Sequence, residues 1–186
     1  RPENVEIRYR NGIAEKISAS LQNTGTVNGV DSIPLKELAA QPWKNGTLTK
    51  ENRASIALEL STTDGDKVLL LGDAHIKDIM NGLDCFYPKQ EHPIRYKIIK
   101  LSHHGSKNNF RPAFIQMVHA DAFLVSTNGD FFGHPDKEVI AQIICNTDSI
   151  IGFNYGERKN SLFTKQDFID FPNLKERVFT TISCLE

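Results

Sequence analysis

Cysteine is scarce in this sequence, and its spacing excludes the simplest thiolate sites. The chain of 186 residues has three cysteines, Cys85, Cys145 and Cys184, and no two of them stand in CxxC or CxxxC spacing. Three cysteines cannot all pair within one chain, so we expect no disulfide framework. We interpret them as free thiols in a reducing compartment, which favours a cytoplasmic location, or as small core residues. Both interpretations are favoured over a thiolate metal site.

The sequence also lacks an excess of charge of one sign and any long apolar run. A formal net charge of -1 provides no global basic field that would collect nucleic acid, which leaves only a local basic patch for that purpose. No apolar run approaches the ~18 residues of a membrane span, and no signal peptide opens the chain. The chain begins with Arg1-Pro2 rather than Met, a start that would be expected of a processed product or of a piece excised from a longer protein.

What remains is the composition of one ordinary globular domain, 39% hydrophobic and 24% charged. Residues 1–50 carry the weakest pattern and predict poorly defined strands and loops packed on the same domain as residues 51–186. Within them we expect strands at 5–9 and 17–21 around the turn Asn11-Gly12, and a short helix at 34–40. Trp43, the single tryptophan, is interpreted as a packing anchor.

Stronger periodicity begins after residue 51. Apolar runs at 55–60 and 67–71, separated by the turn sequence at 63–66, predict a hairpin. Helical spacing predicts helices at 74–83, 112–118 and 136–145, and further apolar runs predict strands at 94–101, 122–126, 149–153, 161–164 and 177–182. Alternating strands and helices of this length indicate a layered α/β fold that gathers the polar strand ends at one edge.

Chemically active side chains stand at three of these strand ends. One strand ends at Asp73, the next runs into the adjacent His103 and His104, and the third is followed by His134. Carboxylate and imidazole groups brought together suit a divalent ion such as Zn²⁺, Mn²⁺ or Fe. Ser106 and the backbone amides after the neighbouring glycine are candidates to receive an anionic oxygen of a substrate.

Four sequence blocks in this order resemble the C-terminal half of a metallo-β-lactamase-fold hydrolase. They are Asn52-Arg-Ala-Ser55, Leu69-Leu-Leu-Gly-Asp73, Lys100-Leu-Ser-His-His-Gly-Ser106 and Gly133-His-Pro135. The branch they resemble is that of the extracellular domain of the DNA-uptake channel proteins of the ComEC type, over residues 52–163. The resemblance implies an αββα sandwich, of which this chain would hold the C-terminal half plus extra N-terminal material.

The resemblance also implies a role for each site residue. Asp73 matches a carboxylate that bridges two divalent metals, for which we expect zinc with manganese or iron as alternatives, and His103 matches a ligand of the second metal. In this match His104 either supports the metal ligands from behind or faces the substrate. His134 matches a position near the scissile group, where it would bind a phosphoryl oxygen or protonate the leaving group. Asn52 either helps to shape the site or merely starts a strand. The implied reaction is attack of a metal-activated water on a phosphoester or nucleic-acid bond.

One departure from the family limits these expectations. A complete member carries a histidine-rich metal-binding motif upstream of the hairpin, whereas the first histidine of this chain is His75. Catalytic zinc normally takes three protein ligands plus water, so two ligands from one half are too few. Either the missing half lies on another segment, or a partner chain supplies it, or the ancestral site has been lost. In the last case the chain would be a metal-free binding or interaction module.

Each candidate residue also has a plain structural reading. Asp73 could cap the helix that follows it, the two adjacent histidines could belong to a polar loop, and His134 could mark a turn before a proline-initiated helix. The polar stretch at 107–111 either is a solvated face or contacts a phosphate-bearing substrate.

Overall fold

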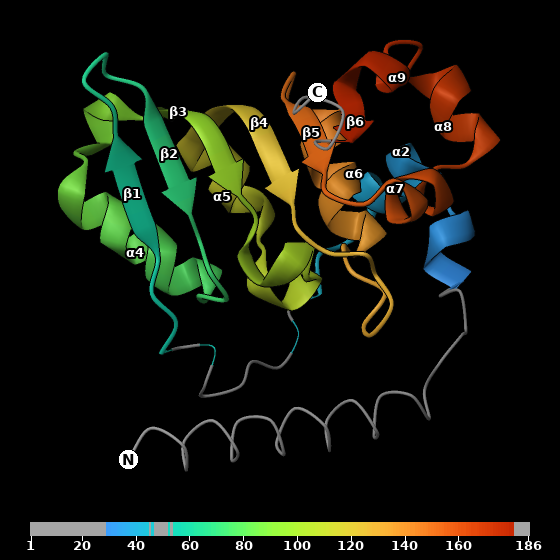
Figure 1. Ribbon diagram of the computed structural model, residues 1–186, viewed down its shortest axis with the longest axis horizontal. Coiled ribbons are helices and arrows are strands. Elements are labelled where there is room, and N and C mark those ends of the chain that lie inside the picture. The colour runs from blue at the N-terminus through green and yellow to red at the C-terminus, as the bar shows by residue number, and fades with distance from the viewer. Residues whose placement is uncertain (1–28, 45, 47–51, 53, 181–186) are drawn as a thin grey trace.

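A six-stranded mixed sheet organises the chain, seen in a computed structural model that describes residues 29–44, 46, 52 and 54–180 (Figure 1). The strands lie in their order along the sequence, with the first antiparallel to the second and all later neighbours parallel. They are β1 (Leu58–Ser61), β2 (Lys67–Leu70), β3 (Ile94–Lys100), β4 (Val118–Val125), β5 (Ile150–Phe153) and β6 (Val178–Thr180). The general α/β class predicted from the sequence is therefore confirmed.

The predicted hairpin is present as β1 and β2. Leu58 pairs with Leu70 and Ser61 with Lys67. Between them, the backbone N–H of Thr62 donates to the carbonyl of Asp66 over 2.8 Å, and the Thr62 hydroxyl accepts from the Asp66 N–H over 3.1 Å. Two apolar runs around turn residues thus form the hairpin that the sequence predicts.

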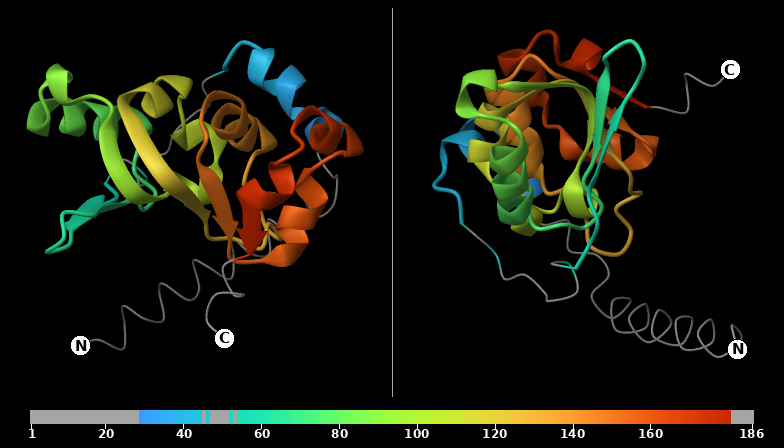
Figure 2. Two further views of the ribbon diagram at one scale, coloured as in Figure 1. Left: turned by 90° about the horizontal axis from the view of Figure 1, so that it is seen from above. Right: turned by 90° about the vertical axis from the view of Figure 1, so that its left-hand side faces the viewer.

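Helices cover one face of the sheet (Figure 2). On that face lie α4 (Ile76–Phe86), α5 (Pro112–Met117) and α6 (Lys137–Asn146), and α2 (Leu35–Ala40) packs against α6. Shorter helices surround the β5 and β6 end of the sheet: α7 (Gly156–Leu162), α8 (Lys165–Asp170) and α9 (Leu174–Arg177). Single 3₁₀ turns occur at η1 (Gly29–Ser32), η2 (Lys89–Glu91), η3 (Ser102–Gly105) and η4 (Lys107–Asn109).

The described part of the N-terminal region is tied to the domain by a buried ion pair. Lys137, at the start of α6, donates from Nζ to the Asp167 carboxylate and to the Asp31 carbonyl, each over 3.0 Å. The backbone N–H of Leu35 donates to the same carboxylate over 2.6 Å, and Leu35 itself is buried. Burial raises the pKa of Asp167, but these donors lower it more, so the net pKa lies below the ordinary value.

The structure corrects some predicted boundaries. Residues 161–164 are not a strand, because Leu162 ends α7 and Thr164 caps α8 through a capping box with Asp167. The strand predicted at 122–126 begins earlier, since α5 passes directly into β4 at Val118. The predicted strands at 5–9 and 17–21 lie outside the described residues, and the helix at 34–40 is present as α2.

Two further expectations concern thiols and membranes. Cys85 is exposed and Cys145 half-buried, and both are free thiols, whereas Cys184 lies outside the described residues. Within the described part of the chain, no helix combines the length and the apolar character needed to cross a bilayer.

Candidate active site

The four sequence blocks meet at the carboxyl ends of β2, β3 and β4. The backbone N–H of His103 donates to the Gly72 carbonyl over 2.9 Å, which joins the loop after β3 to the loop after β2. The N–H of Asp136 donates to the Gly105 carbonyl over 3.0 Å, which joins the same loop to the start of α6. The expectation that polar strand ends gather at one edge is thus confirmed for these loops.

Ser55 and Gly72 place Asp73. The Ser55 hydroxyl accepts the backbone N–H of Asp73 over 3.0 Å. Gly72 has a φ of +53°, and a Cβ there would lie 2.8 Å from the carbonyl oxygen of Ile56, so only glycine fits. The N-cap residue of α4 is His75, so the alternative prediction that Asp73 caps this helix is wrong.

Two consecutive histidines adopt left-handed backbone conformations. His103 has a φ of 44° and His104 a φ of 58°, each of which costs about 1–3 kcal/mol for a residue with a Cβ. The next residue, Gly105, has a φ of +85°, and a Cβ on it would come within 2.7 Å of the Pro135 Cβ. Close packing of the two loops therefore requires glycine here, and strain of this kind concentrates at functional sites.

Asn109 determines which nitrogen of His103 carries the proton. The Asn109 amide nitrogen donates to the carbonyls of Asp73 over 2.9 Å and Ala74 over 3.4 Å, so its oxygen faces His103 Nδ1 at 3.1 Å. Nδ1 must then donate, which leaves the lone pair on Nε2. The Asn52 amide nitrogen, Nδ2, lies 3.0 Å from the same Nδ1. Two N–H donors cannot bond each other, so a protonated Nδ1 requires the Asn52 amide to be turned to present its oxygen.

His104 is fixed in the same tautomer by a backbone carbonyl. Its Nδ1 donates to the Ser126 carbonyl at the end of β4 over 2.5 Å, so its lone pair is also on Nε2. Burial lowers the pKa of His104, and the hydrogen bond to Ser126 only partly opposes that effect. The imidazole is therefore neutral near pH 7 and able to act as a ligand or as a proton acceptor.

His134 faces His103 and is backed by a carboxylate. The two ring centroids lie 5.5 Å apart, near enough for both imidazoles to reach one small ligand. His134 Nδ1 is 3.6 Å from Asp136 Oδ1, while Asp136 Oδ2 accepts the backbone N–H of Lys107 over 2.7 Å. Burial raises the pKa of Asp136, but His134 and Lys107 lower it more, so it is a carboxylate at neutral pH.

Arg158 holds the loop that carries His134. Its Nε donates to the His134 carbonyl over 3.1 Å, and its Nη2 donates to the carbonyls of Gly133 over 2.5 Å and Pro135 over 2.9 Å. Nη1 pairs with the Asp31 carboxylate over 2.9 Å. No motif marks Arg158, Asn109 or Asp136 as site residues, and only contacts across the fold reveal them.

Other residues predicted to contact the substrate, Ser106 and Lys107, are buried or already paired within the protein. Ser106 is 2% exposed, and its N–H donates to the His103 carbonyl over 3.0 Å, so its hydroxyl has little surface to offer a substrate. Lys107 forms an ion pair with Glu138 over 2.9 Å. The half-buried Lys100 lies near Asp73; burial lowers its pKa and the Asp73 carboxylate opposes that shift.

The donor chemistry suits a metal, but the number of donors is small. Histidines that bind metal typically donate their second ring N–H to an oxygen, which is the arrangement of His103 and His104. Among the described residues, however, no three His, Cys, Asp or Glu side chains form a group able to hold a metal ion. The chemistry fits a metal ligand set, then, and its completion requires donors beyond these.

No family model, curated protein or solved structure matches the chain. Its functional interpretation therefore depends on the geometry of the site.

Proposed function

We propose that this chain forms part of a metal-dependent hydrolase of the metallo-β-lactamase-like αββα type, acting on a phosphoester or nucleic-acid bond. Asp73 and His103 would hold the metal, and His104 and His134 would face the substrate. The observation that carries the proposal is that the Nδ1 atoms of His103 and His104 each lie within hydrogen-bond distance of an oxygen, of Asn109 and of the Ser126 carbonyl. This contact assigns the proton to Nδ1 and leaves the Nε2 lone pair for a ligand.

The donor set is suited to zinc, with manganese or iron as alternatives. When bound, such a metal supplies Lewis acidity and lowers the pKa of a water molecule toward ~7. The protein's own contribution is orientation: Asn109 fixes the His103 ring, and the Ser126 carbonyl fixes the His104 ring. Rings fixed before substrate arrives need no reorganisation during the reaction.

His134 is proposed to donate a proton to the leaving group. The Asp136 carboxylate next to its Nδ1 stabilises the protonated imidazole, and the opposite nitrogen, Nε2, would then deliver the proton. Arg158 keeps this ring in place through the three carbonyls of its loop. His134 thus acts on the leaving group while His103 holds the opposite side of the site.

The bare face of the hairpin supports the interpretation as half of a sandwich. Ile56, Leu58 and Leu60 are 77%, 51% and 51% exposed, on a face of β1 and β2 that no described helix covers (Figure 2). A second sheet packed there would bury this apolar surface. We propose that such a layer, on another segment or a partner chain, brings the missing metal ligands.

One observation favours a second candidate, a metal-free binding module. The described residues contain too few clustered donors for a closed metal site. In that case the same loops would recognise a ligand through hydrogen bonds from neutral imidazoles.

Hydrolysis of bis(p-nitrophenyl) phosphate with added Zn²⁺ or Mn²⁺ separates the two candidates. With the layer that carries the missing ligands present, on a longer chain or as an added partner, we expect metal-dependent turnover that falls about 100-fold or more in Asp73→Ala and His103→Ala. His119→Ala, which removes a half-exposed imidazole paired with Asp121, is the matched control and should keep full activity. Turnover that is no higher in the parent chain than in His103→Ala would favour the binding module instead.

A further inference from the structure

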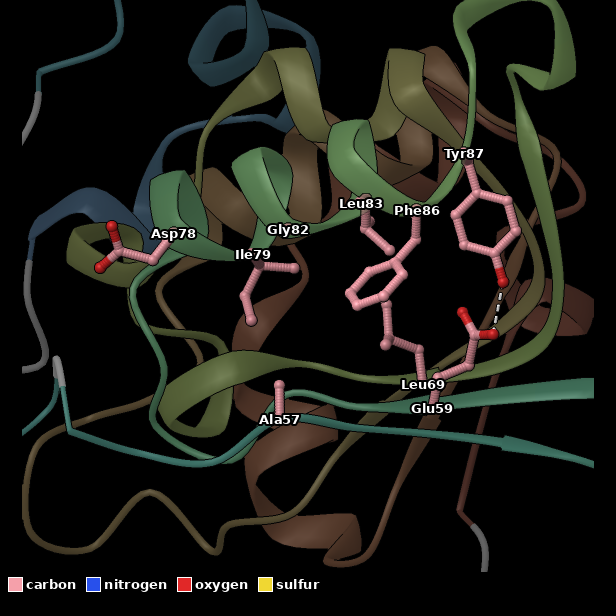
Figure 3. Close-up of a pocket in the computed structure, with 9 residues that line it drawn as sticks. All are labelled: Ala57, Glu59, Leu69, Asp78, Ile79, Gly82, Leu83, Phe86 and Tyr87. Atoms are coloured by element: carbon pink, nitrogen blue, oxygen red, sulfur yellow. Dashed lines mark hydrogen bonds between the residues drawn. The ribbon is translucent and has the colours of Figure 1, made fainter.

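A groove separate from the histidine cluster runs between α4 and the β1–β2 hairpin (Figure 3). Its volume is about 500 Å³, within the range of small-molecule sites of ~300–1,000 Å³. None of the residues proposed above to bind metal or substrate lines it. The lining consists of Ala57, Glu59, Leu69, Asp78, Ile79, Gly82, Leu83, Phe86 and Tyr87.

Gly82 keeps this groove open at a cost to the helix. It lies inside α4, where glycine is less favourable than alanine by about 1 kcal/mol. No positive φ requires a glycine there, and a Cβ at this position would meet nothing within 4 Å. Packing therefore does not explain why a glycine stands here. Because glycine has no side chain, this position leaves space along the groove.

The groove has an apolar floor and an exposed aromatic rim. Leu69 and Leu83 are buried at its base, whereas Phe86 is 81% exposed beside it. In Figure 3 the Phe86 ring points toward the space between the helix and the hairpin. An exposed phenylalanine next to an open apolar groove is a surface that a ligand would bury.

The charged groups that line the groove are both acidic. Glu59 and Asp78 stand at opposite ends of it, and no lysine or arginine is among its lining residues (Figure 3). The Glu59 carboxylate is held by two hydroxyl donors, Tyr87 at 2.5 Å and Tyr96 at 2.6 Å. Lys67 joins this network through the Tyr87 hydroxyl, 3.0 Å from its Nζ, and its ammonium also attracts the Glu59 carboxylate, so it offsets part of the negative charge without lining the groove.

We propose that this groove binds a small amphiphilic cation. Its apolar part would lie against Leu69, Leu83 and the open position at Gly82, and its protonated amine would pair with Glu59. The positioned carboxylate and the absence of a lining cation select a positive head group, and the apolar floor selects a hydrocarbon tail. This site is independent of the proposed hydrolase function.

Three probes with the same eight-carbon tail test this proposal: octylammonium, 1-octanol and octanoate. Each is titrated into the full chain below its micelle-forming concentration, and the amide NMR signals of α4 are followed together with calorimetry. We expect saturable shifts at Gly82, Leu83 and Phe86, with octylammonium bound about tenfold or more tightly than octanoate. Glu59→Gln should remove that preference and leave octanol binding unchanged.

Filling the groove provides the matched structural test. Gly82→Phe places a ring in the groove and should abolish octylammonium binding, while Asn81→Phe places the same ring on the neighbouring exposed helix position and should not. Gly82→Ala, with its smaller side chain, should bind more weakly and melt at a higher temperature, which separates blocking from unfolding. Absence of saturable shifts, equal binding of the three probes, or full binding by Gly82→Phe would each overturn the proposal.

Discussion

At the scale of single residues, Asn109 joins the loop after β2 to the loop after β3 through one side chain. It is 2% exposed and contacts the His103 ring and the carbonyls of Asp73 and Ala74. Its amide therefore sets both a tautomer and the path of the chain after β2. Sequence alone offers no sign of this role, since Asn109 stands in a polar stretch with Lys107 and Arg111 that reads equally well as a solvated loop.

Replacing Asn109 should weaken metal binding without unfolding the protein. In Asn109→Leu the His103 Nδ1 loses its acceptor, so we expect zinc affinity to fall about 10–100-fold. The carbonyl of Asp73 also loses a donor, which should reduce the free energy of unfolding by about 1–3 kcal/mol. Competition with a zinc-binding dye measures the first effect and urea denaturation the second. Asn108→Leu, at an exposed neighbour, is the control; equal zinc affinities in the two variants would contradict this role.

At the scale of elements, the packing of two loops explains why glycine follows the histidine pair. Gly105 combines a positive φ with a close approach to Pro135, whereas Gly65, in the hairpin turn, has a φ of +88° and open space around it. Comparing substitutions at these two glycines therefore distinguishes the effect of backbone strain on stability from the effect of a steric clash.

Alanine at the two positions should have unequal effects on stability. Gly65→Ala introduces only the left-handed strain, about 1–2 kcal/mol. Gly105→Ala adds a clash with Pro135, and overpacking of this kind costs a further ~1–3 kcal/mol. Free energies of unfolding from urea denaturation of both variants provide the comparison. A loss at Gly105 no larger than the loss at Gly65 would show that the loops are not packed as described.

The buried Lys137–Asp167 pair should make stability depend on acid. Because the pKa of Asp167 is lower in the folded state, its contribution is fully present above the unfolded value of about 4 and is lost as pH falls through the folded pKa. Asp167→Asn leaves the Lys137 charge buried without its partner, which should cost about 3–5 kcal/mol at pH 7.

Free energies of unfolding at pH 7 and at acidic pH would show this dependence. The difference between the parent chain and Asp167→Asn should shrink as the solution becomes more acidic. Asp170→Asn, which changes an exposed ion pair with Lys36, is the control. A difference that does not change with pH would show that Asp167 is not ionised in the folded protein.

Periodic elements of the fold were predictable because local pattern and tertiary role agree. Helix α4 follows the apolar spacing that one covered face imposes, and the β1–β2 hairpin follows from a turn sequence between two apolar runs. Residues 161–164 were predicted wrongly because apolar Leu162 and Phe163 resemble a strand, while Thr164 and Asp167 form the capping box that begins a helix. Short apolar runs are ambiguous in this way unless capping is considered.

The candidate site was predictable only as a list of strand-end residues. Asp73, His103 and His134 lie at ends of successive elements, so an α/β topology already brings their loops to one edge. The partners that orient them are Asn109, Asp136, Arg158 and the Ser126 carbonyl, and these are selected by side-chain direction and loop packing. Such contacts depend on tertiary geometry, which no spacing rule encodes.

At the scale of the whole molecule, helices cover one face of the sheet and apolar residues of the hairpin stand bare on the other (Figure 2). The histidine cluster lies at the carboxyl edge of this sheet, and the groove at α4 lies along the hairpin. The proposed second layer would complete both the sandwich and the ligand set. The number of metal ions held per chain is therefore the quantity that most directly reports on the proposal.

Metal analysis of the purified chain by mass spectrometry is the decisive measurement. In the protein that includes the proposed second layer, we expect at least one equivalent of a transition metal per chain, lost in Asp73→Ala and in His103→Ala and kept in the control Asp121→Ala. Asp121 pairs with Lys97 over 3.0 Å, away from the strand ends that carry the histidines. Less than one equivalent of any transition metal, unchanged by Asp73→Ala, would contradict metal-dependent hydrolysis by this polypeptide.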